Sequence, residues 1–510
     1  MNRAAFAALL LGAATVCGFA PLRWFPLPLL TLALLFVLWR HVPQSHQGTT
    51  FGAGDLLRGA ARTAWLGWLW GFGCFLGGVS WVYVSMHDVG GMPAPIAALA
   101  TLALCASLAL YPALAGWLFA RFRCGGAWRD ALLAAGAWTL CEWLRGWLLT
   151  GFPWLAVGYS QSPPSPLAGY AALLGVYGVG LLVAALAALL AFSGRRPGNA
   201  TGAIVVLAVL AGGYALQRIA WTQPVGAPLT VSLLQGNISQ DSKWDPEFLP
   251  HSLDTYARLA RTHPAQLRVL PETALPMFLD DVPEDYLREL MANGPTLFGV
   301  ALHTRTADDP DGYSNAAVTL SADGRLQSYA KSHLVPFGEF VPPGFAWFLA
   351  LMRMPMSDFS AGPAYQPPLE IAGQRIAPNI CYEDLFGEEI LRALPAATLL
   401  VNLSNTAWFG DSLAQPQHLQ IAQMRAMETG RTMLRATNTG MTAAVRPDGT
   451  ILAALPAFTA DALMVEVSGY TGMTPYAHWG NAPALLLVAG ALLPALWRRR
   501  SRLTAADRGG

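Results

Sequence analysis

Long apolar runs constrain this chain more than any other feature of its sequence. A helix that crosses the hydrocarbon core of a bilayer needs about 20 mostly apolar residues. Eight runs of roughly that length, bounded by Arg, Pro or Gly, lie near residues 4–21, 24–39, 62–86, 93–120, 128–150, 166–192, 201–217 and 481–497. With 54% hydrophobic and 12% charged residues, the chain is too apolar for one water-soluble domain. We predict a multi-pass α-helical membrane domain of about eight transmembrane helices.

The first two runs leave two interpretations open. Only Gly18–Trp24 separates them, so they form either two short spans or one re-entrant hairpin. Arg3 followed by an apolar run also resembles a signal peptide. We favour two uncleaved spans.

Arginines alternate between the loops that join the runs. Positively charged residues are retained on the cytoplasmic side of a membrane. Loops three and five hold no Lys or Arg, and Arg23 in loop one is an exception to the alternation. The even-numbered loops and the C-terminal tail hold Arg40, Arg58, Arg121, Arg123, Arg129, Arg195, Arg196, Arg498, Arg499, Arg500 and Arg502. With Arg3 inside, both termini are predicted to be cytoplasmic, and the loop after the seventh run faces the opposite side.

That loop has the pattern of a folded domain. Its apolar runs shorten to strand length at 229–238, 268–272, 296–302, 316–320, 375–381, 397–402, 442–446 and 462–467. Helical periodicity occurs at 246–262, 283–293 and 417–430. Strands alternating with helices predict an α/β sandwich. We expect transmembrane helices one to seven in residues 1–220, an extracytoplasmic catalytic domain in 221–475, and a final helix with a basic tail in 476–510.

Charge and motif content exclude several functions. The net charge of +1 provides no basic field for nucleic acid. We find neither zinc-type Cys or His spacing nor a Gly-rich phosphate loop. The sequence therefore predicts no metal, cofactor or nucleic-acid partner.

Cys381 is the candidate nucleophile. The other five cysteines lie in or beside the apolar runs, so Cys381 has no disulfide partner within the predicted catalytic domain. It ends a predicted strand, just before the acidic pair Glu383 and Asp384. Position alone is equally compatible with a small buried hydrophobic residue. As a nucleophile, its thiol would need a nearby base to take the proton.

Lysine usage favours the catalytic interpretation. Only two of the 32 Lys and Arg residues are lysines, Lys243 and Lys331. The compact ammonium of Lys331 suits a place beside an oxyanion, whereas guanidinium is bulkier and always charged. The alternative is that this lysine occurs in a hairpin by chance and has no chemical role.

Two carboxylates complete the candidate site. Glu272 follows an apolar strand and lies between Pro271 and Pro276, which suits a general base. Glu339, eight residues after Lys331, is a candidate for holding that lysine or shaping the site. For both, the alternative is an ordinary solvated loop acid.

Three motifs, in this order, resemble the Glu, Lys and Cys motifs of nitrilase-type carbon-nitrogen hydrolases: Pro271-Glu272, Lys331–Glu339 and Asn379–Glu383. The flanking spans, together with the segments Gln235–Trp244 and Asn402–Asp411, resemble the bacterial apolipoprotein N-acyltransferase family. This resemblance covers almost the whole chain.

The resemblance implies a nitrilase-like α-β-β-α sandwich domain on the periplasmic face of eight inner-membrane helices. It implies that a monomer without a cofactor acylates the N-terminal amine of diacylglyceryl-cysteine apolipoproteins from a phospholipid, through a thioester. Carried onto matching positions, Glu272 resembles the general base, Lys331 the oxyanion-stabilising cation and Cys381 the nucleophile. Supporting roles are implied for Glu339, Tyr382, Glu383 and Trp244.

Three of the supporting residues could equally have ordinary structural roles. Tyr382 would then be a core aromatic, Trp244 a packing aromatic, and Glu383 the partner of an arginine such as Arg435. We expect His333 and His418 to be structural rather than part of a Cys-His pair.

Two other functions remain to be weighed. One is a membrane-tethered amidase or nitrilase, although eight spans exceed what an anchor needs. The other is a transporter with a sensor domain, which would place ionisable residues inside the spans. Only Glu142 and Arg145 are obvious there, and we interpret them as a contact on one helix face.

Overall fold

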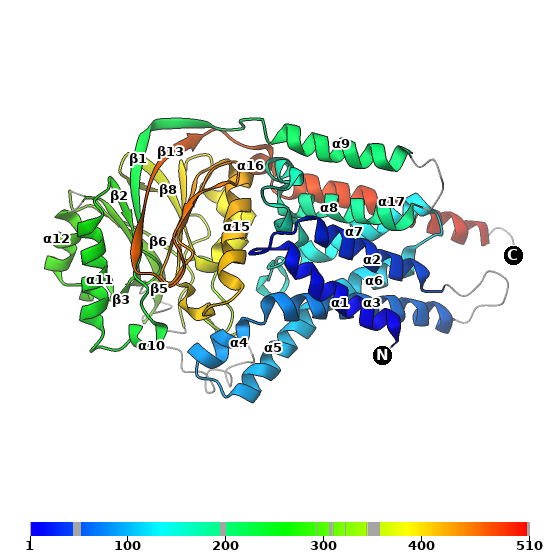
Figure 1. Ribbon diagram of the computed structural model, residues 1–510, viewed down its shortest axis with the longest axis horizontal. Coiled ribbons are helices and arrows are strands. Elements are labelled where there is room, and N and C mark those ends of the chain that lie inside the picture. The colour runs from blue at the N-terminus through cyan, green and yellow to red at the C-terminus, as the bar shows by residue number, and fades with distance from the viewer. Residues whose placement is uncertain are drawn as a thin grey trace. The chain divides into compact units, whose positions relative to one another are not determined.

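The computed structural model describes residues 2–43, 53–193, 200–292, 294–304, 309, 311–321, 323–342, 344 and 358–506 (Figure 1). The chain divides into two compact units. The helical unit comprises Met1–Ser80, Ala98–Ile219 and Trp479–Gly510, and the α/β unit comprises Trp81–Ala97 and Ala220–His478.

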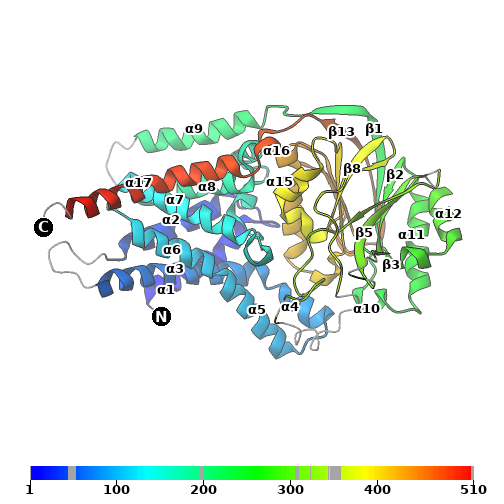
Figure 2. The same cartoon turned by 180° about the vertical axis from the view of Figure 1, so that it is seen from behind.

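The helical unit is built of apolar helices that run alongside one another (Figure 2). They are α1 (Arg3–Thr15), α2 (Pro26–His41), α3 (Ala53–Val79), most of α5 (Ala94–Leu108), α6 (Leu110–Phe122), α7 (Ala127–Arg145), α8 (Ala171–Phe192), α9 (Ala200–Leu216) and α17 (Ala482–Ala506). Among the described residues, the segments Ala94–Phe122 and Pro166–Phe192 are long and apolar enough to cross a membrane. The bent pair Leu57–Val79 and Val82–Val89 gives a third if it counts as one span.

Four other predicted spans form shorter apolar helices, and α7, at the predicted span 128–150, is not among the described helices that are long and apolar enough to cross a membrane. Arg3–Gly18, Pro26–His41, Gly202–Leu216 and Ala482–Pro494 form apolar helices of 10–17 residues. The first two runs are thus separate helices joined by a turn. Arg195, Arg196 and the side chains of Arg498–Arg502, on which the predicted orientation partly depends, lie outside the described residues. The described helices support a membrane protein, with fewer established spans than the eight we predicted.

Glu142 and Arg145, in the last turn of α7, hold the non-helical segment that follows it. Non-helical backbone inside a membrane domain needs protein partners for its polar groups. Arg145 Nη1 donates to the carbonyl oxygens of Phe152 (2.5 Å) and Trp154 (2.6 Å). Glu142 Oε1 accepts from the Val157 N–H at 2.9 Å. These contacts extend beyond the single helix face that we expected.

The described part of the α/β unit contains two β-sheets. The first has seven strands in the order β13-β1-β2-β4-β5-β6, with β3 also paired to β4. Its strands are β1 (Gln223–Gln235), β2 (Leu267–Val269), β3 (Leu275–Phe278), β4 (Thr296–His303), β5 (Tyr313–Leu320), β6 (Leu326–Ala330) and β13 (Asp461–Thr471). The second sheet has the order β12-β11-β10-β9-β8-β7. Its strands are β7 (Leu369–Ile371), β8 (Gln374–Ile380), β9 (Leu399–Ser404), β10 (Met433–Thr437), β11 (Ala443–Val445) and β12 (Ile451–Ala454).

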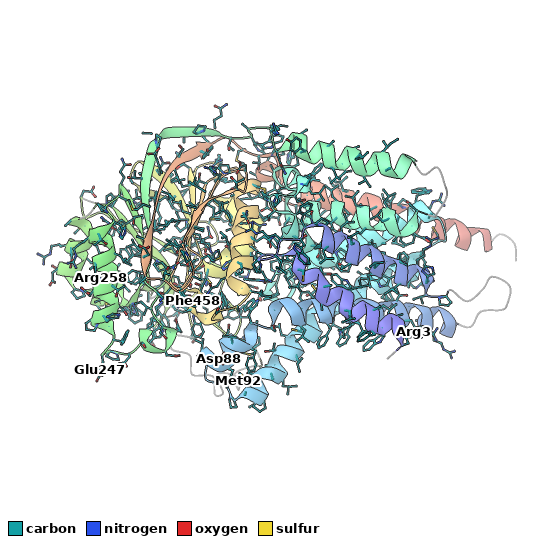
Figure 3. All side chains as sticks on the ribbon, viewed as in Figure 1. Arg3, Asp88, Met92, Glu247, Arg258 and Phe458 are labelled. Carbon is teal, nitrogen blue, oxygen red and sulfur yellow. The ribbon has the colours of Figure 1, made fainter. Side chains whose placement is uncertain are left out.

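Three apolar cores lie between the layers of sheets and helices. One core joins the facing sides of both sheets, for example through Leu233 and Leu403. A second joins the first sheet to α11 (Leu249–Thr262) and α12 (Glu284–Ala292), and a third joins the second sheet to α15 (Ala414–Thr429). On α11 the exposed Arg258 follows a buried stretch and marks the solvent side (Figure 3). The layers are α-β-β-α, which confirms the predicted sandwich.

All eight predicted strands overlap observed ones, and five short strands were not predicted: β3, β6, β7, β10 and β12. These have only three to five residues, too few to establish a period. The strand predicted over residues 268–272 is shorter than expected. Because β2 ends at Val269, Glu272 lies in the loop that follows.

Residues 81–97 belong to the α/β unit, although we predicted residues 81–86 and 93–97 within membrane spans. The Ser85 hydroxyl donates to the carbonyl oxygen of Trp408 at 2.7 Å. The rings of Trp81 and Phe409 meet edge to face, with centroids 4.8 Å apart. These contacts join the segment to the loop that follows β9.

Candidate active site

Cys381 lies directly after β8, at the start of a 3-10 turn. Its φ of +52° falls in the left-handed region, which residues other than glycine seldom adopt. Glu383 Oε2 accepts from the Ile380 N–H at 2.7 Å, and Asn402 Nδ2 donates to the Cys381 carbonyl oxygen at 3.2 Å. These hydrogen bonds hold a strained residue in place, as is common where a side chain must be presented for chemistry.

Lys331 follows β6 and is 1% exposed. Its Nζ contacts both oxygens of Glu339, at 2.8 and 2.7 Å, and lies 3.7 Å from Glu272 Oε1. Burial lowers the pKa of Lys331, but the carboxylates of Glu339 and Glu272 outweigh burial and raise it above its ordinary value. Lys331 is therefore a permanent cation held between two carboxylates.

Glu272 is buried in the loop after β2, and both of its carboxylate oxygens accept hydrogen bonds. Oε1 accepts from Asn315 Nδ2 and Oε2 from the Asn405 N–H, each at 2.7 Å. Asn315 Nδ2 also donates to Glu339 Oε1 at 2.9 Å, so this amide joins the two acids. The loop passes so close to β4 that a Cβ at Gly299 would lie 2.6 Å from the Glu272 Cα.

The charges of Glu272, Lys331 and Glu339 all act on the Cys381 thiol. Burial raises the pKa of Cys381 above its ordinary value, Glu272 raises it further, and Lys331 lowers it. A thiol with a raised pKa is protonated near neutral pH, so attack by this sulfur requires a base. The structure thus brings together the four predicted residues Glu272, Lys331, Glu339 and Cys381.

Glu383 has a different partner from the arginine that we weighed. Its Oε1 accepts from the backbone N–H groups of Ser332 (2.8 Å) and His333 (3.1 Å) and from the Tyr329 hydroxyl (2.9 Å). Burial raises the pKa of Glu383, while Lys331 and the backbone donors oppose that shift. Glu383 therefore ties the segment after Lys331 to the Cys381 turn.

The two predicted aromatic residues lie at the periphery of this cluster. Tyr382 is buried, and its ring meets those of Phe386 and His333 edge to face at 5.1 and 5.8 Å. Trp244 caps the C-terminal end of α10 (Gln240–Lys243) and is partly exposed.

A second buried charged cluster involves Asp384 rather than Glu383. Arg435 Nη1 lies 3.1 Å from Asp384 Oδ2, and Arg435 Nη2 lies 2.7 Å from His418 Nδ1. Because a guanidinium only donates, His418 Nδ1 accepts, and its Nε2–H donates to Asp384 Oδ1 at 2.7 Å. Burial and Arg435 lower the pKa of His418. His333 instead pairs with Glu389 at 3.1 Å.

Three further residues of the cluster had no assigned role in the sequence analysis. Asn315 donates to both acids, and the Asn405 N–H donates to Glu272. Lys243 Nζ donates to Thr273 Oγ1 at 2.6 Å and to the Glu272 carbonyl oxygen at 3.3 Å. No pattern in the sequence marked Asn315, because its strand also holds the polar residues Ser314 and Thr319.

Comparisons with known proteins agree over both units. Residues 11–189 match the family model of the apolipoprotein N-acyltransferase N-terminal domain, and residues 230–476 match that of carbon-nitrogen hydrolases. The chain is 47% identical over 514 residues to an apolipoprotein N-acyltransferase of Nitrosomonas europaea, covering 97% of this chain and 98% of the relative. It is 48% identical over 507 residues to one of Ralstonia nicotianae, covering 97% and 93%.

Among solved structures, a carbon-nitrogen hydrolase from Helicobacter pylori G27 aligns with a TM-score of 0.36 at 16% identity, over 48% of this chain and 90% of that chain. The identity to the full-length relatives extends through the apolar helices and the sandwich alike. This chain belongs to the apolipoprotein N-acyltransferase family and is an acyltransferase.

Proposed function

We propose that this enzyme acylates the N-terminal amine of diacylglyceryl-cysteine apolipoproteins with an acyl group from a phospholipid, through a thioester on Cys381. The observation that carries this proposal is the joint action of Glu272, Lys331 and Glu339 on the Cys381 thiol. A protonated thiol beside a buried carboxylate and a permanent cation suits base-assisted attack on an ester carbonyl.

In the first half-reaction, the Cys381 sulfur attacks the ester carbonyl carbon of the phospholipid, and Glu272 accepts the thiol proton. The carbonyl oxygen becomes an oxyanion, which Lys331 and the backbone N–H after Cys381 stabilise. The ester C–O bond then breaks, and Glu272 returns the proton to the departing lysophospholipid oxygen. The acyl group remains on Cys381 as a thioester.

In the second half-reaction, the apolipoprotein amine attacks the thioester carbonyl carbon, and Glu272 accepts a proton from the amine. A second oxyanion forms beside Lys331. The C–S bond breaks, the Cys381 thiolate takes the proton from Glu272, and the amide product leaves. Loss of one oxyanion donor costs about 10²- to 10³-fold in rate.

The supporting residues hold these groups in position. Glu339 holds the ammonium of Lys331 through both oxygens. Glu383 fixes the Cys381 turn through the Ile380 N–H. We assign Tyr382 and Trp244 to the substrate-facing surroundings of the site.

We place the enzyme in the bacterial inner membrane, with the catalytic domain on the periplasmic side and both termini in the cytoplasm. Residues 1–220 would supply seven spans, residues 221–475 the catalytic domain, and residues 476–510 the last span and the basic tail. The match of residues 11–189 to the N-terminal family domain supports this arrangement. We propose a monomer, because the residues of the mechanism come from one chain.

Mass spectrometry of the full-length protein purified from membranes tests the proposal. We expect a fatty-acyl adduct on the Cys381 peptide that neutral hydroxylamine removes. Cys381→Ala removes the adduct, and Cys381→Ser, if it acylates, carries an oxygen ester that resists neutral hydroxylamine. Cys17→Ala, a change at another free cysteine, is the matched control and keeps the adduct. Absence of an adduct under phospholipid saturation would favour the tethered amidase instead.

A further inference from the structure

The mechanism above uses only one of the two lysines in the chain. The other, Lys243, ends the short helix α10 and is 3% exposed. Its Nζ donates to Thr273 Oγ1 at 2.6 Å and to the Glu272 carbonyl oxygen at 3.3 Å. Lys243 therefore contacts the backbone of the proposed general base directly.

The net charge of the cluster explains why a second cation is favourable at this position. Glu272 and Glu339 are each 8% exposed, and Lys331 lies within 4 Å of both carboxylates. Lys331 alone leaves one net negative charge buried, which is costly without a further cation. Lys243 supplies a second positive charge. The other groups that act on this cluster are the Cys381 thiol, Glu383, Asp384 and Arg435.

The backbone at Glu272 also needs a fixed position. Thr273, the next residue, has a φ of +45°, which is unfavourable for a β-branched side chain. On the β4 side, a Cβ at Gly299 would lie 2.5 Å from the Thr273 nitrogen, so this strand admits the loop only because glycine is there. Lys243 binds the same peptide through the Glu272 carbonyl oxygen.

We propose that Lys243 is a positioning residue for the general base: its ammonium fixes the Glu272–Thr273 turn and balances the charge of Glu272. Glu272 is thereby held where it can accept the Cys381 proton. This inference rests on the proposed role of Glu272. It also gives a reason for lysine in an arginine-rich chain, because a compact ammonium reaches two acceptors in one tight turn.

Electrostatic reciprocity supports the same conclusion. Burial lowers the pKa of Lys243 to about 7, and the charge of Glu272 opposes that shift. Two groups that interact do so with one coupling free energy, so protonated Lys243 favours ionised Glu272 by the same amount. The effect is largest below pH 7, where Lys243 carries its proton.

The test compares Lys243→Met, which removes the charge, with Thr273→Val, which removes one hydrogen-bond acceptor and keeps the charge and the branched side chain. The full-length protein in detergent is treated with iodoacetamide at pH 6 and at pH 9, and the rate of alkylation of the Cys381 peptide is followed by mass spectrometry. For Lys243→Met we expect base-assisted alkylation at pH 6 to slow about tenfold, and alkylation at pH 9, where Lys243 has lost its proton in the wild type, to keep the wild-type rate. For Thr273→Val, which keeps the ammonium and its contact with the Glu272 carbonyl oxygen, we expect a smaller loss at pH 6 than for Lys243→Met.

A double variant keeps the inference testable if Lys243→Met folds poorly. Glu339→Gln removes one negative charge, so Lys243→Met with Glu339→Gln restores the charge balance. We expect this double variant to fold better than Lys243→Met and to return the alkylation rate at pH 6 towards that of the wild type. A purely structural role of the Lys243 side chain predicts no such rescue.

The outcomes separate this inference from the proposed function. Wild-type rates at pH 6 in both single variants, equal losses for Lys243→Met at pH 6 and pH 9, or no rescue by the double variant would each overturn it. Acyl-enzyme formation from vesicles of phosphatidylethanolamine and phosphatidylglycerol is measured on the same samples. Failure of the wild type to form it, with the slower alkylation of Lys243→Met at pH 6 present, would overturn the thioester mechanism and leave the role of Lys243 in place.

Discussion

Two of the buried charged clusters in the α/β unit differ in composition. Asp384, His418 and Arg435 form a network with one carboxylate, one cation and a neutral imidazole whose tautomer is set by its partners. Glu272 and Glu339 instead share Lys331, with Lys243 on the backbone side and a protonated thiol nearby.

This difference distinguishes charges that only hold two elements together from charges that can take part in proton transfer. A matched carboxylate and guanidinium hold two elements together and have no proton to exchange near neutral pH. A cluster with two acids around one ammonium can accept a proton and remain ionic. Burial and charge alone therefore do not identify a catalytic site, whereas an excess of acceptors beside a nucleophile does.

The largest expected effect is on the rate, from Glu272→Gln. The amide oxygen still accepts from the Asn405 N–H, but the side chain no longer takes a proton, so acyl-enzyme formation should fall by about 10²- to 10⁴-fold. Intact-mass spectrometry over time gives the rate. Glu247→Gln, at an exposed residue (Figure 3), is the matched control and should react as the wild type does. A wild-type rate for Glu272→Gln would remove Glu272 from the mechanism.

Disruption of the Asp384–His418–Arg435 cluster should lower the free energy of unfolding. Arg435→Met leaves Asp384 buried without its cation, which typically costs about 3–5 kcal/mol. Denaturant unfolding in detergent measures the loss, and the exposed Arg258→Met should change stability by less than about 0.5 kcal/mol. Unchanged stability of Arg435→Met would contradict a structural role for this cluster.

A smaller effect is expected from Asn315→Leu. Asn315 Nδ2 donates to Glu272 and Glu339, and a hydrogen bond to a charged group is worth about 1.5–3 kcal/mol. We expect acyl-enzyme formation to slow roughly tenfold, because the two acids lose a shared donor. Thr319→Val on the same strand is the control. A wild-type rate for Asn315→Leu would show that this amide has no influence on the base.

The smallest effect is the pH dependence that His418 contributes to stability. Burial and Arg435 lower the pKa of His418 in the folded state, so below about pH 6.5 the unfolded chain binds a proton that the folded protein excludes. Stability from this group is present above that pH and is lost as the pH falls, by at most about 1.4 kcal/mol per pH unit. The difference between wild type and His418→Gln in unfolding free energy, followed from pH 7.5 to pH 5, should therefore narrow. A constant difference would contradict the neutral imidazole.

Residues of unusual type were the ones that could be predicted from sequence. Cys381 was the lone cysteine of its domain, Lys331 was one of two lysines, and Glu272 followed an apolar strand. Asp384 and Arg435 were not predicted as a pair, because 51 residues separate them and carboxylates and arginines are common. The role of Lys243 was missed for the same reason, since 29 residues separate it from Glu272.

The sequence by itself determined the apolar helices, the sandwich and the order of the three motifs. Hydrophobic periodicity and chain order are local properties, and burial of apolar surface follows from them. The tertiary structure decided which charged side chains contact one another and that residues 81–97 join the α/β unit. It also decided that Glu272 lies in a loop held by Lys243, Asn315 and Asn405. Electrostatic interactions fall off with distance in space, so partners far apart in sequence meet only once the sheets have packed.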